Sequence, residues 1–344
     1  MHQYVERASN LVMTEELFGD RIVNFLYSKT RERAPRLFDL VTSGRVSSLL
    51  GFCNFDLPLA ANLLGNQRFL ARCGVNLSEC LEPAAFFTTA RRIFERRIRY
   101  WQCRPMPEAP DSVVSPADAR VLIGSLDQEA PLFVKDKFFH YQELFGPGQG
   151  NWLAAFRGGD FAIFRLTPDK YHYNHAPVSG RVVAFFEVSG CYHSCNPGAV
   201  VEVVTPYSRN KRVVTILNTD VPGGSQVGLV AMVEVVALMI GEVVQCYSDY
   251  RYELPTRVRP GMFLRRGQPK SMYRPGSSTD ILLFQQGRVR FAEDLLAQRR
   301  RGDVVSRFSL GFGEIMTESD IRVRSLLAHP CRRAMAPVGG CAGS

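Results

Sequence analysis

The residues best suited to chemistry lie in a small-residue turn, Pro-Gly-Ser-Ser-Thr at residues 275–279, that leads into an apolar run at residues 281–284. Turns of this composition commonly do no more than open a strand. In a second interpretation, the Ser277 hydroxyl attacks the Gly276 carbonyl and converts the amide into an ester. Elimination would leave dehydroalanine, which hydrolyses to a pyruvoyl group. Glycine suits the acyl side because it lacks a Cβ and tolerates a strained turn.

Two adjacent serines compete for the role of nucleophile. Counting back from the apolar run selects Ser278, whereas adjacency to glycine selects Ser277. We assign the attack to Ser277, because cleavage needs the Gly276 carbonyl as acyl donor. A hydroxyl nucleophile also needs a base that a third group holds in place.

Two histidines could supply that base. His172 and His175 stand three residues apart, between Pro168 and Pro177. In a turn-like conformation this spacing puts both rings on one side. Two histidines in a loop are more often a polar surface pair than a catalytic one. Histidine nevertheless titrates near neutrality and can take and return a proton, so both are candidates.

Asp118 is the candidate for the third group. It follows Pro116 in a Ser-Pro-Ala-Asp stretch, where an aspartate commonly serves the turn itself. Its carboxylate could instead complete an Asp-His-Ser triad, in which it orients the imidazole and stabilises the imidazolium.

Several stretches resemble, in the right order, the phosphatidylserine decarboxylase family, whose members process themselves and use a pyruvoyl group. The most specific is an Asp-x-Tyr-His-x-x-His-x-Pro run from Asp169 to Pro177. The resemblance covers roughly residues 65 to 325, and the stretches that carry it are residues 68–79, 86–87, 115–120, 134–146, 166–180 and 276–278.

The resemblance implies a role for each candidate residue. Self-cleavage would occur at Gly276-Ser277, with His175 as the base and Asp118 as the group that orients it. His172 would serve mainly the decarboxylation of phosphatidylserine to phosphatidylethanolamine. The pyruvoyl group derived from Ser277 would be the cofactor, because its carbonyl can accept the electrons released with CO2. The resemblance implies no metal, and nothing in the sequence calls for pyridoxal phosphate.

Three positions depart from the family pattern. Ala119 follows Asp118 where glycine is usual, Pro275 stands before the cleavage glycine, and Val236 replaces a glycine. These departures favour one alternative, a non-catalytic lipid-binding or scaffold homologue. A pyruvoyl decarboxylase of a soluble amino acid is another. The joint presence of all five candidate residues favours the enzyme.

Composition limits the partners and the compartment. The chain has 344 residues and a formal net charge of +9, which fits an anionic membrane surface and a phospholipid substrate. No basic motif interleaved with aromatics favours nucleic acid. The nine cysteines are odd in number, and the N-terminus has no apolar signal core, which indicates a reducing cytoplasm. The Cys-Tyr-His-Ser-Cys cluster at residues 191–195 indicates buried thiols more than a metal site.

No stretch of the sequence predicts a membrane span, which needs about 20 mostly apolar residues. Asp56 and Pro58 interrupt residues 46–65, and two glutamates interrupt residues 227–244. Apolar faces with arginines in the region before residue 109 instead predict peripheral attachment, at the cytoplasmic face of the cell membrane. Besides its own cleaved small chain, a second copy in a homodimer is left open as a partner.

The predicted fold class is α+β. A helical, membrane-associating region at residues 1–108 packs on a mostly antiparallel, β-rich catalytic domain of sandwich or barrel type at residues 109–325, and a tail follows at 326–344. Residues 105–110 form a stiff linker. Expected helices are 11–27, 30–49, 46–64, 86–101 and one that begins at Ala292. Expected strands are 121–124, 152–156, 161–165, 180–188, 199–204, 212–217, 228–234, 242–247 and 281–284.

Overall fold

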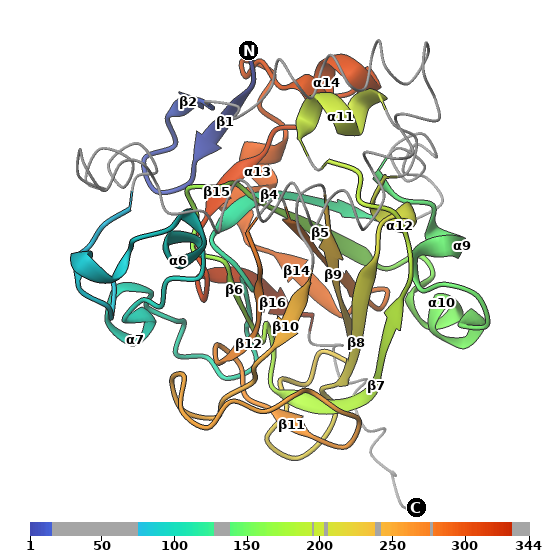
Figure 1. Ribbon diagram of the computed structural model, residues 1–344. Coiled ribbons are helices and arrows are strands. Elements are labelled where there is room, and N and C mark those ends of the chain that lie inside the picture. The colour runs from blue at the N-terminus through green and yellow to red at the C-terminus, as the bar shows by residue number, and fades with distance from the viewer. Residues whose placement is uncertain are drawn as a thin grey trace, which may run out of the picture.

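A ten-stranded sheet forms the centre of the protein, and two three-stranded sheets and short helices surround it (Figure 1). This computed structural model describes residues 1–15, 75–126, 138–194, 196–202, 206–237, 242–275 and 278–331. The strands of the described residues are β1 (Gln3–Glu6), β2 (Val12–Thr14), β3 (Val113–Val114), β4 (Ala119–Ser125), β5 (Asp160–Leu166), β6 (Tyr173–His175), β7 (Gly180–Val188), β8 (Arg212–Asn218), β9 (Leu229–Val236), β10 (Val243–Gln245), β11 (Phe263–Leu264), β12 (Pro269–Tyr273), β13 (Ser278–Phe284), β14 (Val289–Phe291), β15 (Ser319–Ile321) and β16 (Leu326–Pro330).

The helices are short, and local signals set their ends. The Thr89 side chain accepts a hydrogen bond from Arg92 N at the start of α6, and Gly313, with φ of 76°, ends α14. The helices of the described residues are η3 (Ala84–Phe86, a 3-10 turn), α6 (Ala90–Phe94), α7 (Tyr100–Cys103), α9 (Tyr141–Leu144), α10 (Gly150–Phe156), α11 (Pro197–Glu202), α12 (Pro206–Arg209), α13 (Glu293–Arg299) and α14 (Arg307–Phe312).

The large sheet runs in the order β11-β7-β8-β9-β13-β5-β4-β15-β1-β2. Neighbouring strands are antiparallel except for β1 and β15, which are parallel. Every residue of β13 pairs with β9 on one side and with β5 on the other. The strand that follows the candidate cleavage turn is therefore buried along its whole length.

The two faces of β13 contribute to two separate cores, because successive side chains of a strand point to opposite faces. Leu282 and Phe284 join a core shared with the small sheets β10-β12-β6 and β14-β16-β3. Ile281 and Leu283 join a core that residues of α9, α10, α12 and α14 cover. Burial on both faces explains why residues 281–284 read as an unbroken apolar run.

The predicted fold class is confirmed in its main features. The protein is α+β, and its sheets are mostly antiparallel. The large sheet ends at β11 and β2, so the described strands form no closed barrel. Seven of the predicted strands correspond to β4, β5, β7, β8, β9, β10 and β13, and the helix predicted at Ala292 is α13.

Two predicted strands are wrong, because residues 152–156 lie in α10 and residues 199–204 overlap α11. Trp152 and Phe156 are four residues apart and pack toward the same core, which is helical spacing. Pro197 begins α11, and proline suits the first turn of a helix. A Cβ on Gly311 of α14 would come within 2.4 Å of Val201, so this glycine allows α11 and α14 to pack closely.

The prediction of a helical N-terminus is wrong where the chain begins. There β1 and β2 form a hairpin that extends the large sheet, and β2 occupies the start of the helix predicted at 11–27. Arg165 of β5 anchors the hairpin, because it contacts Glu15 and Glu318 at 2.7 and 2.6 Å. The partner of β1 is β15, which lies near the opposite end of the sequence, so local periodicity cannot reveal the pairing.

The predicted division into residues 1–108, 109–325 and 326–344 stays a prediction. The helix predicted at 86–101 is divided into α6 and α7, and the helices predicted at 30–49 and 46–64 lie outside the described residues, as does the end of the tail. The Pro107 carbonyl in the predicted linker accepts a hydrogen bond from Arg266 at 2.9 Å, and β16 extends the folded core beyond residue 325. Among the described residues, no helix has the length and apolar character to cross a membrane.

Candidate functional site

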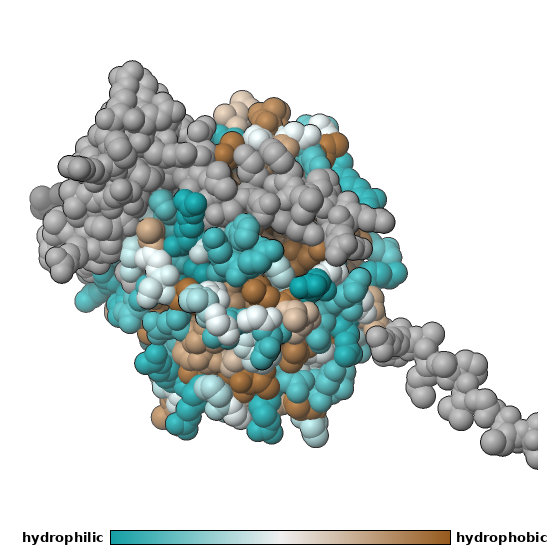
Figure 2. All heavy atoms as spheres, turned by 90° about the vertical axis from the view of Figure 1, so that its right-hand side faces the viewer, coloured by the Kyte–Doolittle hydropathy of each residue, from teal (hydrophilic) through white to brown (hydrophobic). Residues whose placement is uncertain are grey.

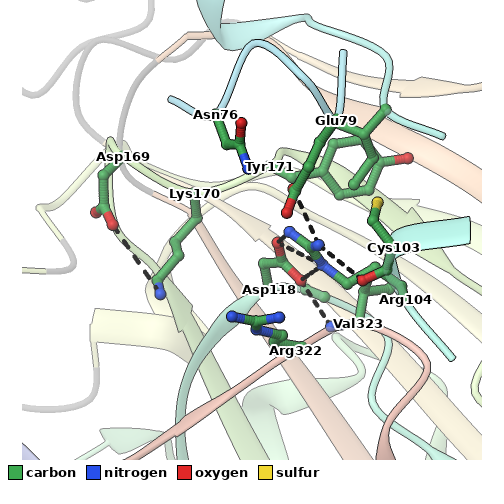
Figure 3. A network of polar contacts seen from close by, with 12 residues as sticks. Asn76, Glu79, Cys103, Arg104, Asp118, Asp169, Lys170, Tyr171, Arg322 and Val323 are labelled. Carbon is green, nitrogen blue, oxygen red and sulfur yellow. Dashed lines mark hydrogen bonds and ion pairs between the residues drawn. The ribbon is translucent and has the colours of Figure 1, made fainter. Parts of the chain in front are cut away.

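Asp118 lies between β3 and β4, where an arginine holds it. Arg104 donates from Nε to Oδ1 at 3.0 Å and from Nη2 to Oδ2 at 2.8 Å, and the Val323 backbone N–H donates to Oδ1 at 2.8 Å. Figure 3 shows the Arg104 guanidinium between Asp118 and Glu79, its second carboxylate partner at 3.0 Å. Within the described part of the chain, no hydrogen bond joins Asp118 to His172 or His175.

The charge of Asp118 is stable at neutral pH. Burial raises the pKa of this carboxyl group, but the charge and hydrogen bonds of Arg104 outweigh burial and lower the pKa below its ordinary value. The carboxylate lines a polar cavity of about 270 Å³. Four basic and four acidic side chains line this cavity, namely Arg96, Arg104, Lys170 and Arg322, and Glu79, Asp118, Asp169 and Asp320.

His172 is fully buried just before β6, and one of its ring nitrogens is free. Nδ1 lies 2.8 Å from the Lys170 carbonyl oxygen, which can only accept, so the ring proton is on Nδ1. Nε2 is buried and has no hydrogen-bond partner among the described residues. Burial, and next the positive charge of Arg96, lowers the pKa to about 3. His172 is therefore a neutral imidazole with an available lone pair.

His175, the last residue of β6, is equally buried, but both of its ring nitrogens have partners. Nδ1 lies 2.9 Å from the Gly267 carbonyl oxygen, and Nε2 lies 3.0 Å from the Tyr171 hydroxyl. Burial is the main cause that lowers the pKa of His175 to about 3. Its backbone N–H donates to the Pro116 carbonyl at 2.7 Å, which ties β6 to the turn that carries Asp118. The negative charge of Asp118 acts on both histidines. It opposes part of the lowering, because a negative charge nearby raises the pKa of an imidazole.

The two histidines should make the protein less stable in acid. Each has a pKa of about 3 in the folded protein against 6.5 ordinarily, so between these values only the unfolded chain binds the proton. The free energy of unfolding therefore falls as pH is lowered through this window, by about 1.4 kcal/mol per pH unit for each histidine. His172→Gln should reduce the slope of this free energy, measured by urea unfolding between about pH 5 and pH 6.5.

The comparison with the parent isolates His172. Burial raises the pKa of Asp280, which gives a slope of the opposite sign, but this slope is common to both proteins and cancels. An unchanged slope in His172→Gln would mean that the buried ring takes up its proton as readily in the folded protein as in the unfolded chain.

The structure describes both sides of the candidate cleavage turn, whereas Gly276 and Ser277 themselves lie outside the described residues. The chain enters the turn at Tyr273, whose backbone N–H donates to the His172 carbonyl at 3.0 Å. It leaves the turn at Ser278, whose hydroxyl is buried without a hydrogen-bond partner among the described residues. His172 thus lies beside the strand that leads into the turn, and β13 begins with a hydroxyl that no described residue bonds.

Several polar side chains near this turn were not predicted from the sequence. Lys270 and Glu234 form a fully buried ion pair at 2.6 Å, and Asp280 lies opposite Glu234 in the sheet. Glu234 and Asp280 are charged residue types inside largely apolar strands, which is a usable signal, because a buried charge needs a buried partner. Arg104 carries no such signal, since nothing in its neighbourhood in the sequence points to Asp118.

One cluster has the composition of a metal site. In the described ranges, His2, Glu15 and Glu318 offer ligand atoms within 4.8 Å of one another. Arg165 already contacts both carboxylates, at 2.7 and 2.6 Å, and so supplies the positive charge that they need. In the cluster at 191–195, the predicted buried thiols are wrong for Cys191, which is exposed, and Cys195 lies outside the described residues. We assign no metal to either cluster.

Comparison with known proteins gives one consistent family. Residues 91–307 match the family model for phosphatidylserine decarboxylase, and this segment contains every candidate site residue. The phosphatidylserine decarboxylase proenzyme of Ruminiclostridium cellulolyticum is 28% identical over 305 residues, which are 88% of this chain and 93% of the relative. That of Chlamydia pneumoniae is 29% identical over 301 residues, 87% of this chain and 92% of the relative. Phosphatidylserine decarboxylase proenzyme 2 of Oryza sativa subsp. japonica is 31% identical over 250 residues, which are 72% of this chain but 36% of the relative.

Proposed function

Because the chain belongs to the phosphatidylserine decarboxylase family, we propose that it converts phosphatidylserine to phosphatidylethanolamine after cutting itself in the Gly-Ser-Ser turn. One observation carries this proposal. His172 is a buried, neutral imidazole whose Nε2 has no hydrogen-bond partner among the described residues, and its backbone is hydrogen-bonded to the strand that enters the turn. The relatives described above are named proenzymes, which supports activation by cleavage.

For the cleavage, we assign the attack to the Ser277 hydroxyl. Its oxygen bonds to the Gly276 carbonyl carbon, the peptide C–N bond breaks, and an ester forms. A base then takes the Cα proton of residue 277 as the Cβ–O bond breaks, which leaves a Gly276 carboxylate and a dehydroalanine. Water converts the dehydroalanine into the pyruvoyl group and releases ammonia. A base must take the hydroxyl proton, and we assign this role to His175, oriented by Asp118.

A specific observation favours Ser278 as the second candidate nucleophile. Its hydroxyl is fully buried at the start of β13 and has no partner among the described residues, whereas buried hydroxyls are normally hydrogen-bonded. Since no described residue bonds this hydroxyl, its oxygen lone pairs are available for attack once a base takes its proton. The two candidates give different products, because attack by Ser277 would release a small chain that begins at position 277, and attack by Ser278 one that begins at position 278.

The contacts of His172 and His175 bear on which histidine serves cleavage and which serves decarboxylation. The Tyr171 hydroxyl lies 3.0 Å from Nε2 of His175, whereas Nε2 of His172 is free among the described residues. His175 can act as the cleavage base once Tyr171 turns away from it and Asp118 leaves Arg104. His172 needs neither movement, which favours the exchanged assignment as the second candidate. Either histidine can return a proton to the substrate carbon after CO2 leaves.

The residues around the turn fit a pyruvoyl group. When formed, this group supplies a ketone that binds the substrate amine and withdraws electrons as CO2 leaves. β13 is buried from its first residue, so Ser278, next to the new chain end, is shielded from bulk solvent. His172 is held by the Lys170 carbonyl with its lone pair available, so it can move a proton at Nε2.

Carbon dioxide release tests the proposed activity. Vesicles that contain phosphatidylserine labelled at the serine carboxyl carbon should release labelled CO2, and phosphatidylethanolamine should appear in equal amount. Free labelled serine is the matched substrate control. Release from serine alone would favour the decarboxylase of a soluble amino acid. Vesicle binding by a cleaved protein that releases no CO2 from either substrate would favour the scaffold.

We also propose that the protein contacts the cytoplasmic face of the cell membrane through the region before residue 109, helped by the net charge of +9. The face shown in Figure 2 carries small groups of hydrophobic residues between hydrophilic ones, so this face alone marks no membrane surface. Flotation with anionic vesicles should fall as salt rises, because exposed charges are screened within about 10 Å at 0.1 M salt. Equal flotation at low and at high salt would contradict the electrostatic part of this proposal. The native mass, measured alongside, reports whether the protein is a homodimer.

A further inference from the structure

A hydrogen-bonded bridge spans the candidate cleavage turn. The Tyr273 hydroxyl, at the end of β12, lies 3.0 Å from the Thr279 carbonyl oxygen and 2.7 Å from Oδ1 of Asp280. Tyr273 precedes the scissile bond whichever serine attacks, and Thr279 and Asp280 follow it. All three residues are fully buried. The bridge therefore joins two segments that cleavage would place on different chains.

The bridge lies on the same side of the sheet as the hydroxyl of Ser278, the second candidate nucleophile. Ser278 and Asp280 are two residues apart in β13, so their side chains point to the same face. Tyr273 reaches this face from the small sheet β10-β12-β6, and its ring belongs to the core between the two sheets. The bridge and the first hydroxyl of β13 therefore share one buried layer.

Counting protons indicates that Asp280 is a neutral acid. The Tyr273 hydroxyl has one proton but faces two oxygens, and both can only accept if Asp280 is ionised. If Asp280 carries a proton, its O–H donates to the Tyr273 oxygen, and Tyr273 donates to the Thr279 carbonyl. Burial, reinforced by the charge of Glu234, raises the pKa of Asp280 well above its ordinary value, which agrees with this count.

The charged side chains near Asp280 already have other partners. Lys270 contacts Glu234 at 2.6 Å, and Gln245 and Asn174 donate to the same glutamate at 3.1 and 3.2 Å. Among the described residues, no hydrogen bond or ion pair joins Asp280 to a positively charged side chain. Tyr273 is therefore the group that holds its carboxyl in place.

We propose that the Tyr273–Asp280 bridge positions the turn for self-cleavage. It fixes the arm before the scissile bond against the arm after it, so the serine oxygen and the carbonyl carbon stay within reach of one another, and it holds the two new ends together after the cut. Such fixing lowers the entropic part of an activation barrier. The inference rests on the proposed self-cleavage and adds two positioning residues to it.

The rate of precursor conversion tests the bridge. Full-length precursor from a cell-free synthesis would be followed by intact mass under denaturing conditions. Tyr273→Phe and Asp280→Ala should each cleave about tenfold more slowly, because about 1.4 kcal/mol, the scale of one buried hydrogen bond, is a factor of ten in rate. Asp280→Asn should recover most of the rate lost in Asp280→Ala, because an amide N–H can still donate to the Tyr273 oxygen.

Tyr247→Phe is the matched control. It removes a tyrosine hydroxyl that donates to Asp249 at 2.7 Å, in a loop that does not flank the turn, and should cleave like the parent. Cleavage of the parent with an unchanged rate in Tyr273→Phe would overturn the bridge. Asp280→Asn as slow as Asp280→Ala would overturn the neutral acid. Tyr273→Phe removes one oxygen only, so it decides the matter even if Asp280→Ala does not fold. A parent that never cleaves would instead refute the proposed function.

Discussion

Purified protein is expected to separate under denaturing conditions into two chains, a large one that ends at Gly276 and a small one that spans positions 277–344. Glycine tolerates a strained turn on the acyl side, and β13 pairs with a strand on each side, which holds the chain in place from residue 278 onward. Ser277→Ala should remain a single chain, because alanine has no oxygen to attack with. Intact mass of both chains measures the cut and the modified end together.

The neighbouring serine provides the control. Ser278→Ala should still cleave if Ser277 is the nucleophile. If Ser277→Ala cleaves and Ser278→Ala does not, the nucleophile is Ser278, and the small chain starts one position later, at 278. A single full-length mass for the parent, after prolonged incubation at neutral pH, would contradict self-cleavage altogether.

The second large effect concerns the separation of the two chemical steps. Asp118→Asn and His175→Ala should accumulate uncleaved precursor, since a triad aspartate can be worth about 10⁴-fold in rate. His172→Ala should yield a substantial cleaved fraction with a pyruvoyl end but release little CO2 from phosphatidylserine. Mass spectrometry of the small chain and a CO2 assay on the same sample measure both steps.

The controls for this prediction come from the same cavity. Asp320 lines the cavity with Asp118 and pairs with Lys170 at 2.6 Å, and Asp320→Asn should be processed like the parent. If His172→Ala blocks cleavage and His175→Ala does not, the histidines have exchanged roles, which the lack of a partner for Nε2 of His172 among the described residues favours. If all three site variants cleave like the parent, the triad is a false match.

How well an element could be predicted from the sequence depends on whether the signal lies in its own residues or in a partner far away in the sequence. Residues 180–188 and 281–284 form strands as predicted, because burial on a sheet shows in their composition. The segment at 152–156 has aromatic and apolar residues that suit either state, and its packing decides for α10. The N-terminal hairpin depends on β15, and no local pattern encodes a contact over that separation.

The residues of the candidate site also differ in whether the local sequence reveals them. The spacing of His172 and His175 and the turn at 276–278 are local, so they could be found in the sequence. The partner of Asp118 is not local in this sense, because Arg104 reaches it through the fold and competes with any histidine for the carboxylate. The roles of Asp118, His175 and Ser277 stay predictions, and the structure adds the contacts that must change for them to operate.

The place of β13 in the sheet has a consequence for the order of events during biosynthesis. This strand fills the gap between β9 and β5, and β15 fills the gap between β4 and β1, yet both are translated after the strands that they join. Domains fold as units once their segments are available, so the sheet cannot close before β13 and β15 have left the ribosome. The cut is therefore expected only after β15 has left the ribosome. By then the future small chain is interleaved with the large one, so the mature enzyme should behave as one particle whose two polypeptides come apart only when the sheet unfolds.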